Sequence, residues 1–297
     1  MEYISKLKEL GITFNEISEC KAEYIMKNEI SYYKLMEYSC VFERYNSTEQ
    51  KGKFINLDFS QLYYLSKIDF ELSYIAMQMC LELELIIKTI FLNDVMKFVD
   101  TKAFMKAYYK TDEEYISFVY TADNFETIKS KYNVENIFDL DFDQFIDVVQ
   151  FGTFERILKF FYNEVVQECS SKVKFVIEQI ACIRRIRNIV AHNNSILGQL
   201  SIKRDCKNFK LLAFLGKNGI KNKMLKTNMS KGVVADLCGL FYLYFNLVNS
   251  YEKAFKRLST FNKEYCKKFL SLYSNNSVIN SFYSFMTSVI EIFRKNC

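Results

Sequence analysis

Apolar residues recur at spacings of three and four over the stretch that begins near residue 60. Eight of them form a single stripe: Leu65, Ile68, Leu72, Ile75, Met79, Leu83, Ile86 and Ile90. This spacing matches one face of an α-helix, so it predicts an amphipathic helix of about 30 residues, roughly 45 Å long. A helix of this length is typical of the spine of a helical bundle.

Shorter helices are predicted on both sides of the long one. Residues 3–45 give two or three short helices, with Gly11 as a stop signal and Ser31 opening a further segment. Residues 232–260 and 262–296 are expected to close the chain as helices. Proline is absent and only 8 glycines occur, which favours long helices joined by short connections.

One stretch departs from the helical pattern. Residues 209–226 begin with the apolar run Phe209 to Leu215, pass through Asn218-Gly219 and then alternate apolar and basic residues. Asn-Gly is typical of two-residue hairpin turns, so a small basic β-hairpin is predicted here. The predicted fold class is therefore all-α, a helical bundle with N- and C-terminal helical extensions and one small β-hairpin.

Composition places the chain among globular proteins, since 50% of its residues are hydrophobic and 25% are charged. Neither a membrane-spanning segment nor the apolar core of a signal peptide is apparent, and no contact with a membrane is expected. The 9 cysteines are odd in number and form no C-x-x-C pair, so reduced thiols in a cytoplasm are expected. With a single histidine, zinc sites built on several histidines are excluded within one chain, and no cofactor is expected.

The net charge of +5 is unevenly distributed. Residues 1–150 hold 16 basic and 26 acidic side chains, whereas residues 151–297 hold 24 and 9. Between residues 172 and 231 there are 14 basic side chains against two acidic ones. A basic segment beside an acidic half is typical of a protein that binds a polyanion, although a solvated charged face would give the same pattern.

The only histidine, His192, lies within this basic segment, in the string Arg187-Asn188-Ile189-Val190-Ala191-His192. An imidazole titrates close to neutral pH and can act as a general acid or base. Arginine stays cationic and can hold two oxygens of a phosphate as negative charge develops. This combination indicates chemistry on a phosphodiester, with Arg187, Asn188 and His192 as the candidate catalytic residues.

Helical geometry complicates a site made by one chain. At 100° per residue, Arg187 and His192 point about 140° apart, whereas Asn188 and His192 share a face. Arg187 must therefore reach round the helix, lie where the helix deforms, or serve a site shared with a second chain. The simplest structural alternative is a half-buried arginine paired with a carboxylate and a histidine near a helix end.

The R-N-x-x-x-H pattern resembles the signature of HEPN ribonucleases, and three further segments agree in order along the chain. Asn28 to Leu35 with Tyr38 looks like the "inYYrl..Y" segment of the Abi-like proteins, the AbiD/AbiF abortive-infection family. Phe59 to Lys88, with Asp69, resembles that family's "LY.FD..LR…iE…K" helix, and Phe151-Gly152 with Leu158 resembles "FG.ls.ly". Two positions depart from the pattern: Ser73 stands where the family usually has Arg, and Asn193 where a second His often follows.

The resemblance covers about residues 3–200 and implies a HEPN-type helical core with metal-independent endoribonuclease activity. It also implies a homodimer in which two motifs form one composite cleft. The expected role is that of an antiphage (abortive infection) effector or a member of a toxin–antitoxin pair. The expected partners are substrate RNA, a regulatory non-coding RNA of the kind associated with the AbiF branch, and an antitoxin or phage trigger that restrains or releases the activity.

The chain is accordingly divided into three segments: an N-terminal helical segment (1–58), a HEPN-like core with the motif (59–200), and a basic hairpin with C-terminal helices (201–297). RNA contacts are expected from seven basic residues: Arg184, Arg185, Lys203, Arg204, Lys210, Lys221 and Lys223. Two other functions remain open. One is an RNA-binding HEPN module without catalysis, or the neutralising partner of a toxin, and the other is a protein-interaction subunit whose acidic half binds a basic partner.

Overall fold

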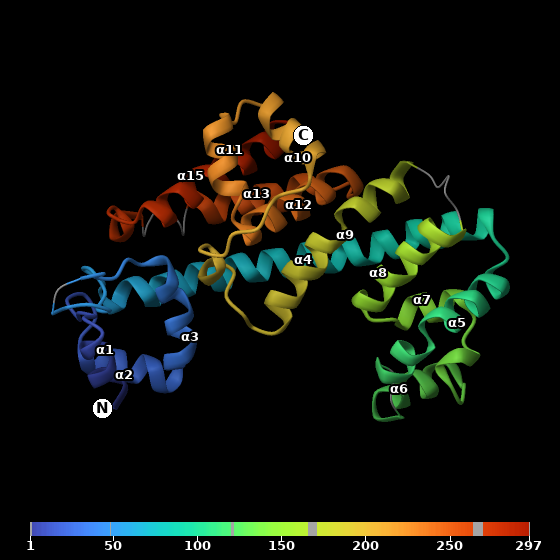
Figure 1. Cartoon of the computed structure of the whole chain (residues 1–297), viewed down its shortest axis with the longest axis horizontal. Coiled ribbons are helices and arrows are strands. Elements are labelled where there is room, and N and C mark those ends of the chain that lie inside the picture. Colours follow the sequence, from blue (N-terminus) through green and yellow to red (C-terminus); the bar gives the residue numbers. More distant parts are fainter. Residues whose placement is uncertain (1, 48, 120–121, 166–170, 264–269, 297) are drawn as a thin grey trace. The chain divides into compact units, whose positions relative to one another are not determined.

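The computed structural model describes residues 2–47, 49–119, 122–165, 171–263 and 270–296, which form helices and no strand (Figure 1). The all-α prediction is confirmed. The α-helices are α1 (Glu2–Glu9), α2 (Glu19–Asn28), α3 (Tyr32–Glu37), α4 (Phe59–Phe98), α5 (Thr101–Val119), α6 (Ala122–Tyr132), α7 (Phe142–Val148), α8 (Phe151–Phe160), α9 (Ser171–Ala191), α10 (Phe209–Lys217), α11 (Asn222–Met229), α12 (Gly232–Leu247), α13 (Tyr251–Phe261) and α15 (Ser277–Lys295). Short 3-10 or π segments are η1 (Tyr38–Val41), η2 (Ile137–Asp139), η3 (Phe161–Val165), η4 (Leu197–Gln199) and η6 (Leu270–Tyr273). Among the described helices, none has both the length and the apolar character needed to cross a membrane.

The chain forms two compact units. Unit 1 comprises Met1–Cys80 and Arg185–Cys297, and unit 2 comprises Leu81–Arg184. The borders of these units fall inside α4 and α9, whereas the three segments predicted from the sequence divide in loops near residues 58 and 200. The two divisions differ because a long helix can belong to two cores, and a composition change does not reveal this.

Helix α4 carries the predicted apolar stripe and is longer than predicted, at 40 residues. Its start is fixed by Asp58, whose Oδ1 accepts a hydrogen bond from the Ser60 N–H at 3.0 Å. The stripe is buried as predicted from Leu65 to Leu83, but beyond that point Ile87 and Phe91 are buried in place of Ile86 and Ile90. The apolar residues of this part of α4 cover more than one face, so their spacing alone does not identify the buried one.

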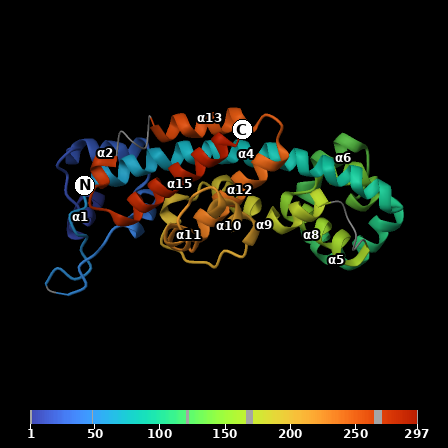
Figure 2. The same cartoon turned by 90° about the horizontal axis from the view of Figure 1, so that it is seen from above.

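The core of unit 1 is built around α12, in which nearly every residue from Gly232 to Tyr244 is buried. Helices α11, α13 and α15 pack together around it, and both views show α13 and α15 side by side (Figures 1 and 2). Stacked rings connect these helices, with the Phe255 and Phe293 centroids 5.1 Å apart. The first part of α4 joins this core through Gln61, whose backbone carbonyl accepts a hydrogen bond from the Tyr273 hydroxyl at 2.7 Å.

Unit 2 has an aromatic core centred on Phe91 of α4. The ring of Phe91 lies 5.5 Å from that of Phe154 and 5.4 Å from that of Phe161, in edge-to-face arrangements. A polar pair supports the same unit, since Arg156 Nε donates to Asp112 Oδ2 at 2.7 Å. This hydrogen bond from Arg156 holds the pKa of the Asp112 carboxyl below its usual range.

The predicted β-hairpin over residues 209–226 is wrong, because this stretch forms the helices α10 and α11. The apolar run buries Leu211 and Leu215, four residues apart on one helical face. Asn218-Gly219 is nevertheless a turn, and Gly219 has a φ of +99°, which favours glycine. Asn-Gly therefore ends a helix here, a function that the dipeptide serves as readily as a hairpin turn.

Candidate functional site at the end of helix α9

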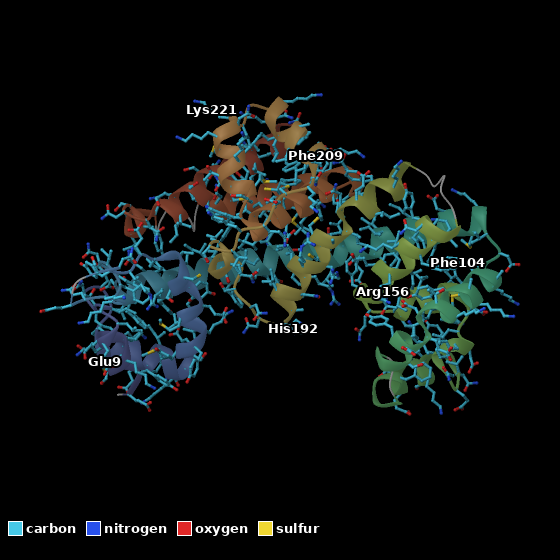
Figure 3. All side chains as sticks on the ribbon, in the orientation of Figure 1. Glu9, Phe104, Arg156, His192, Phe209 and Lys221 are labelled. Carbon is cyan, nitrogen blue, oxygen red and sulfur yellow. The ribbon has the colours of Figure 1, made fainter. Side chains whose placement is uncertain are left out.

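The motif Arg187, Asn188 and His192 lies at the C-terminal end of α9, within unit 1. Ile186 anchors this turn, since its side chain is fully buried. Asn188 is exposed, Arg187 is half-buried, and His192 is exposed just after the last helical residue (Figure 3). The His192 N–H still donates to the Asn188 carbonyl at 3.1 Å, which keeps the two residues one turn apart on the same side. One chain therefore presents an amide and an imidazole together at its surface.

Helix α9 ends because Asn193 adopts a left-handed conformation, with a φ of +52°. Asparagine is among the few residues other than glycine that adopt this region at low cost. The Asn193 N–H donates to the Val190 carbonyl at 2.9 Å, and the Asn194 N–H donates to the Ile189 carbonyl at 2.8 Å. These bonds satisfy carbonyl groups at the helix end and set the direction in which the chain leaves His192.

Helix α3 holds the segment after His192. Lys34 Nζ donates to the Asn193 carbonyl and pairs with Glu37 at 3.0 Å. Glu37 Oε2 in turn accepts a hydrogen bond from the Ser195 N–H at 3.0 Å. Close packing accompanies these bonds, because a Cβ at Gly198 would come within 2.9 Å of the Glu37 carbonyl oxygen.

The buried carboxyl of Asp69, on α4, also holds this segment. It accepts hydrogen bonds from the Leu197 N–H at 2.7 Å, the Ile196 N–H at 3.2 Å and the Tyr38 hydroxyl at 3.0 Å. Burial raises the pKa of Asp69 to about 6, and the hydrogen bonds from Leu197 and Tyr38 oppose this shift. We call these contacts of Lys34, Glu37 and Asp69 with residues 193–197 the α9 clamp.

The sequence analysis assigned no function to Lys34, Glu37 or Asp69, which form the α9 clamp. Lys34 and Asp69, like Tyr38, lie in segments that carry the family resemblance, and this was the only feature of the sequence that could have drawn attention to them. Their pairing with residues 193–197 had no local signal, because it joins parts of the chain that are far apart in sequence. Glu37 was indicated neither by the residues quoted for the family resemblance nor by a local sequence pattern.

Three of the predicted RNA-binding arginines are held by buried carboxylates. Arg185 donates three hydrogen bonds of 2.8, 2.9 and 3.1 Å to Asp236, which is 3% exposed, and Arg204 pairs with the same carboxylate at 2.6 Å. In unit 2, Arg184 pairs with the buried Glu155. About two fifths of each arginine side chain remains exposed, so these groups are positioned by internal pairing but still reach the surface.

The predicted lysines are exposed. Lys210, Lys221 and Lys223 lie on or next to α10 and α11, and Figure 3 shows Lys221 projecting outward. Lys203 is exposed at the point where the chain leaves for these helices. There the Arg204 N–H donates to the Ser230 carbonyl at 2.8 Å, and the Gly232 N–H donates to the Ile202 carbonyl at 2.9 Å. These two bonds bring the start and the end of the α10–α11 segment together.

A pocket of about 450 Å³ lies in unit 1 beside the end of α9. Its lining comes from three segments: α3 with the residues on either side of it (Glu29, Ile30, Ser31, Lys34, Tyr38), the first part of α4 (Ser66, Lys67, Asp69, Phe70, Ser73, Tyr74, Met77), and the end of α9 with the residues that follow it (Val190, Asn193, Asn194). We call it the α3–α4 pocket. It brings three of the segments that carry the family resemblance to one place in the fold.

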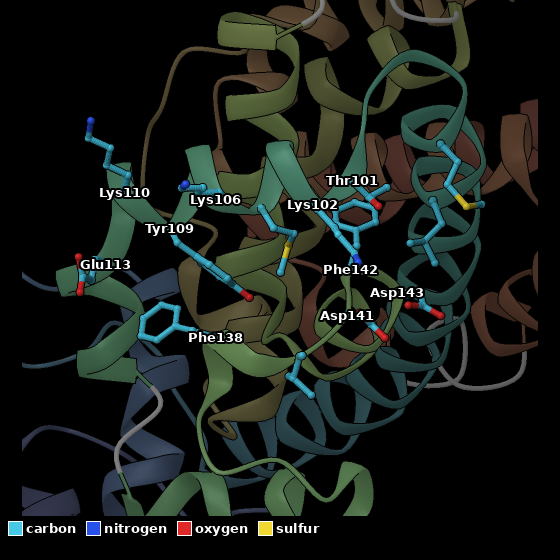
Figure 4. Close-up of a pocket in the computed structure, with 14 residues that line it drawn as sticks. Thr101, Lys102, Lys106, Tyr109, Lys110, Glu113, Phe138, Asp141, Phe142 and Asp143 are labelled. Atoms are coloured by element: carbon cyan, nitrogen blue, oxygen red, sulfur yellow. The ribbon is translucent and has the colours of Figure 1, made fainter.

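Unit 2 contains a larger cavity, of about 1000 Å³, which involves none of the predicted site residues. Figure 4 shows Tyr109 and Phe138 at one end of it, with their ring centroids 4.7 Å apart. Lys102 and Lys106 of α5 and Asp141 and Asp143 also line it, so its charges are mixed. Among the described residues, no cluster of three or more His, Cys, Asp or Glu side chains is arranged to hold a metal ion.

Comparison with protein families identifies the chain. A family model described as Abi-like protein matches residues 26–197, which is more than half of the chain, and the chain belongs to this family. The match spans α3, α4 and α9, and so contains the motif and the α9 clamp. No curated protein and no solved structure matches the chain significantly. Membership of the family suggests a role in abortive infection.

Replacement of Asp69 tests the α9 clamp. Asp69→Asn leaves one acceptor oxygen for three donors and places an amide NH₂ in a buried site. We expect the free energy of unfolding at pH 7 to fall by about 1–3 kcal/mol, measured by urea denaturation. Unchanged stability would show that the hydrogen bonds of Asp69 do not hold the segment after His192.

The pH dependence gives a second readout of the same variant. The folded chain holds the Asp69 proton more tightly than the unfolded chain does, because the pKa of this carboxyl lies near 3.8 in the unfolded chain. The carboxyl therefore stabilises the fold most below about pH 4, and this contribution is lost as the pH rises through about 6. In Asp69→Asn, the free energy of unfolding should therefore no longer fall between about pH 4 and pH 6 on account of this group. Asp112→Asn is the control with the opposite sign, because it removes a carboxyl whose pKa is lowered by Arg156.

Proposed function

We propose that this protein is a metal-independent endoribonuclease of an antiphage (abortive infection) or toxin–antitoxin system. The observation that supports this most directly is the exposed pair Asn188 and His192 at a helix end that the α9 clamp holds in place. A catalytic imidazole needs a supported position and access to substrate, and here the clamp holds the backbone that follows His192 while the side chain stays exposed. Arg187, half-buried in the same turn, supplies a permanent positive charge.

The proposed reaction uses the nucleophile that RNA itself carries. A base removes the proton of the 2′-hydroxyl, and the 2′-oxygen forms a bond to the adjacent phosphorus. The bond from phosphorus to the 5′-oxygen then breaks, and an acid gives this leaving oxygen a proton. The products are a 2′,3′-cyclic phosphate and a 5′-hydroxyl. DNA, which lacks the 2′-hydroxyl, is not a substrate.

The proposed site is shared between two copies of the chain. The reaction needs one group that accepts a proton and another that donates one, and each chain carries a single imidazole. Two chains related by a two-fold axis supply both imidazoles and two arginines at one cleft. In this arrangement, Arg187 of one chain need not reach His192 of the same chain.

A non-catalytic RNA-binding module, or the neutralising partner of a toxin, is the second candidate function. The half-burial of Arg187 favours it, because a guanidinium occupied inside the protein contributes less to a transition state. Both candidates use the exposed lysines near α10 and α11 to bind RNA, and they differ in cleavage.

The proposed catalysis predicts the effect of replacing the motif residues. His192→Ala and Arg187→Ala should each lower the rate of RNA cleavage by about 10²- to 10⁴-fold, because one removes the proton-transfer group and the other the charge that stabilises the phosphorane. The assay follows a labelled single-stranded RNA in EDTA and analyses the product ends. Arg294→Ala is a matched control, since Arg294 pairs with Glu291 on α15, away from the motif. Equal cleavage by all four proteins refutes the nuclease proposal, and cleavage abolished by EDTA indicates a metal.

The second prediction concerns the shared site. A dimer purified with two different affinity tags, one copy wild type and one His192→Ala, should be inactive if each cut needs both imidazoles. If each chain cuts by itself, the same dimer keeps about half of the wild-type rate, because one of its two imidazoles is intact. Light scattering provides the independent check, and a protein that is monomeric at its active concentration contradicts the shared site.

The third prediction concerns RNA binding, measured in the His192→Ala background so that the RNA stays intact. Lys221→Glu combined with Lys223→Glu should weaken binding and lower the salt dependence of the affinity, since fewer counterions are released. Lys51→Glu with Lys53→Glu is the matched control, because these two exposed lysines have the same spacing and give the same charge change. Equal weakening by both pairs would show that net charge, rather than the α10–α11 surface, determines the affinity.

A further inference from the structure

We propose that the α3–α4 pocket binds one unpaired nucleobase of a single-stranded RNA whose backbone passes His192. This inference rests on the proposed function and names the part of the substrate that the same site recognises. The pocket and the motif are adjacent in the fold, because Val190, Asn193 and Asn194, which surround His192 in sequence, line the pocket. A strand that places a phosphate at His192 therefore places a neighbouring base beside this opening.

Two exposed aromatic side chains provide a stacking surface in the pocket. Phe70 and Tyr74 are four residues apart on α4, so they lie on one face of the helix. They are 66% and 59% exposed, which is unusual for large rings that also line a cavity. The guanidinium of Arg257 lies 5.0 Å from the centre of the Tyr74 ring. Aromatic rings accompanied by arginine are the typical surface on which bases of single-stranded RNA stack.

The remaining lining favours a neutral ligand over an anion. The two lysines of the pocket are already paired, Lys34 with Glu37 at 3.0 Å and Lys67 with Glu29 at 3.1 Å. The Asp69 carboxyl is buried and accepts three hydrogen bonds. These groups therefore offer little net charge to a phosphate. A nucleobase needs what is left, an aromatic face together with hydroxyl and amide groups for its edge.

The size of the pocket is consistent with this ligand. Its volume of about 450 Å³ lies within the range of pockets that bind small molecules, about 300–1,000 Å³. A base inside a duplex is stacked and paired, so it cannot enter without first being removed from the helix. The pocket should therefore select single-stranded regions of RNA, such as loops and ends.

The test measures binding of a short fluorescein-labelled single-stranded RNA in the His192→Ala background. Phe70→Ala and Tyr74→Ala should each weaken the affinity by about 5- to 150-fold, the range expected when one base loses an aromatic partner. The dependence of the affinity on salt should stay unchanged, since no phosphate contact is removed. Phe70→Tyr and Tyr74→Phe keep an aromatic ring and should retain the affinity. An RNA of equal length with abasic positions has no base to stack. Phe70→Ala and Tyr74→Ala should therefore bind it as tightly as the parent protein does.

Two controls separate stacking from other effects. Tyr24→Ala removes an exposed tyrosine that carries a stacked cation, Lys21 at 4.5 Å, but does not line the pocket. Leu85→Ala removes a side chain of α4 that is 70% exposed and also lies outside the pocket. Neither change should alter RNA affinity. If Leu85→Ala matches Phe70→Ala and both change the oligomeric state, this face of α4 is a protein interface and the base pocket is refuted.

The outcomes for the pocket and for catalysis are distinguishable. If wild-type protein cleaves RNA while Phe70→Ala and Tyr74→Ala bind it as tightly as the parent does, the pocket is refuted and the nuclease proposal stands. The opposite result is also informative. If wild-type protein does not cleave RNA, but the two variants bind normal RNA more weakly than the parent and bind abasic RNA equally well, the pocket stands and catalysis is refuted.

Discussion

The hydrogen bonds between Asp69 and the backbone of Ile196 and Leu197 are the interaction on which the candidate site depends. The last carbonyls of a helix have no partner within the helix, so a helix end is prone to fray unless the chain beyond it is held. Here a buried carboxyl on one helix satisfies two backbone donors beyond the end of another. Lys34 and Glu37 complete the same arrangement from α3. The backbone at His192 is thus held through contacts made with the residues that follow it.

Two buried carboxyls of unit 1, Asp69 and Asp236, are compensated in different ways. Carboxyl groups that leave water require compensating hydrogen bonds or cations, and Asp69 and Asp236 obtain them from different sources. Asp69 uses backbone N–H groups and a tyrosine hydroxyl, which leaves a carboxyl with a raised pKa. Asp236 uses two arginines, Arg185 and Arg204. Arg185 and Arg204 therefore have a structural role, whereas the predicted lysines on or next to α10 and α11 are exposed.

The sequence predicted the parts of the fold that depend on local periodicity. The long helix was recognised because its 3–4 spacing persists from Leu65 to Leu83, which only one secondary structure explains. Beyond Leu83, Ile86 and Ile87 are both apolar, and the choice between them depends on the aromatic residues that surround Phe91 in unit 2. The hairpin was predicted wrongly because Asn218-Gly219 is compatible with two kinds of turn. The motif residues were proposed from their spacing in the sequence, and their role stays a prediction. The α9 clamp could not be proposed in this way, because its partners meet only in the folded chain.

The segment that contains α10 and α11 leaves and rejoins the chain at a single place, where residues 202–204 bond to residues 230–232. Because its two ends are bonded to each other, changes of charge among its exposed side chains need not displace the helices that precede and follow it. It also begins after the stretch that the family model matches, which ends at residue 197. The clamped helix end thus lies within the stretch that the family model matches, and the exposed lysines of α10 and α11 lie outside it, so the charge of this surface can change without altering the contacts that hold the chain after His192.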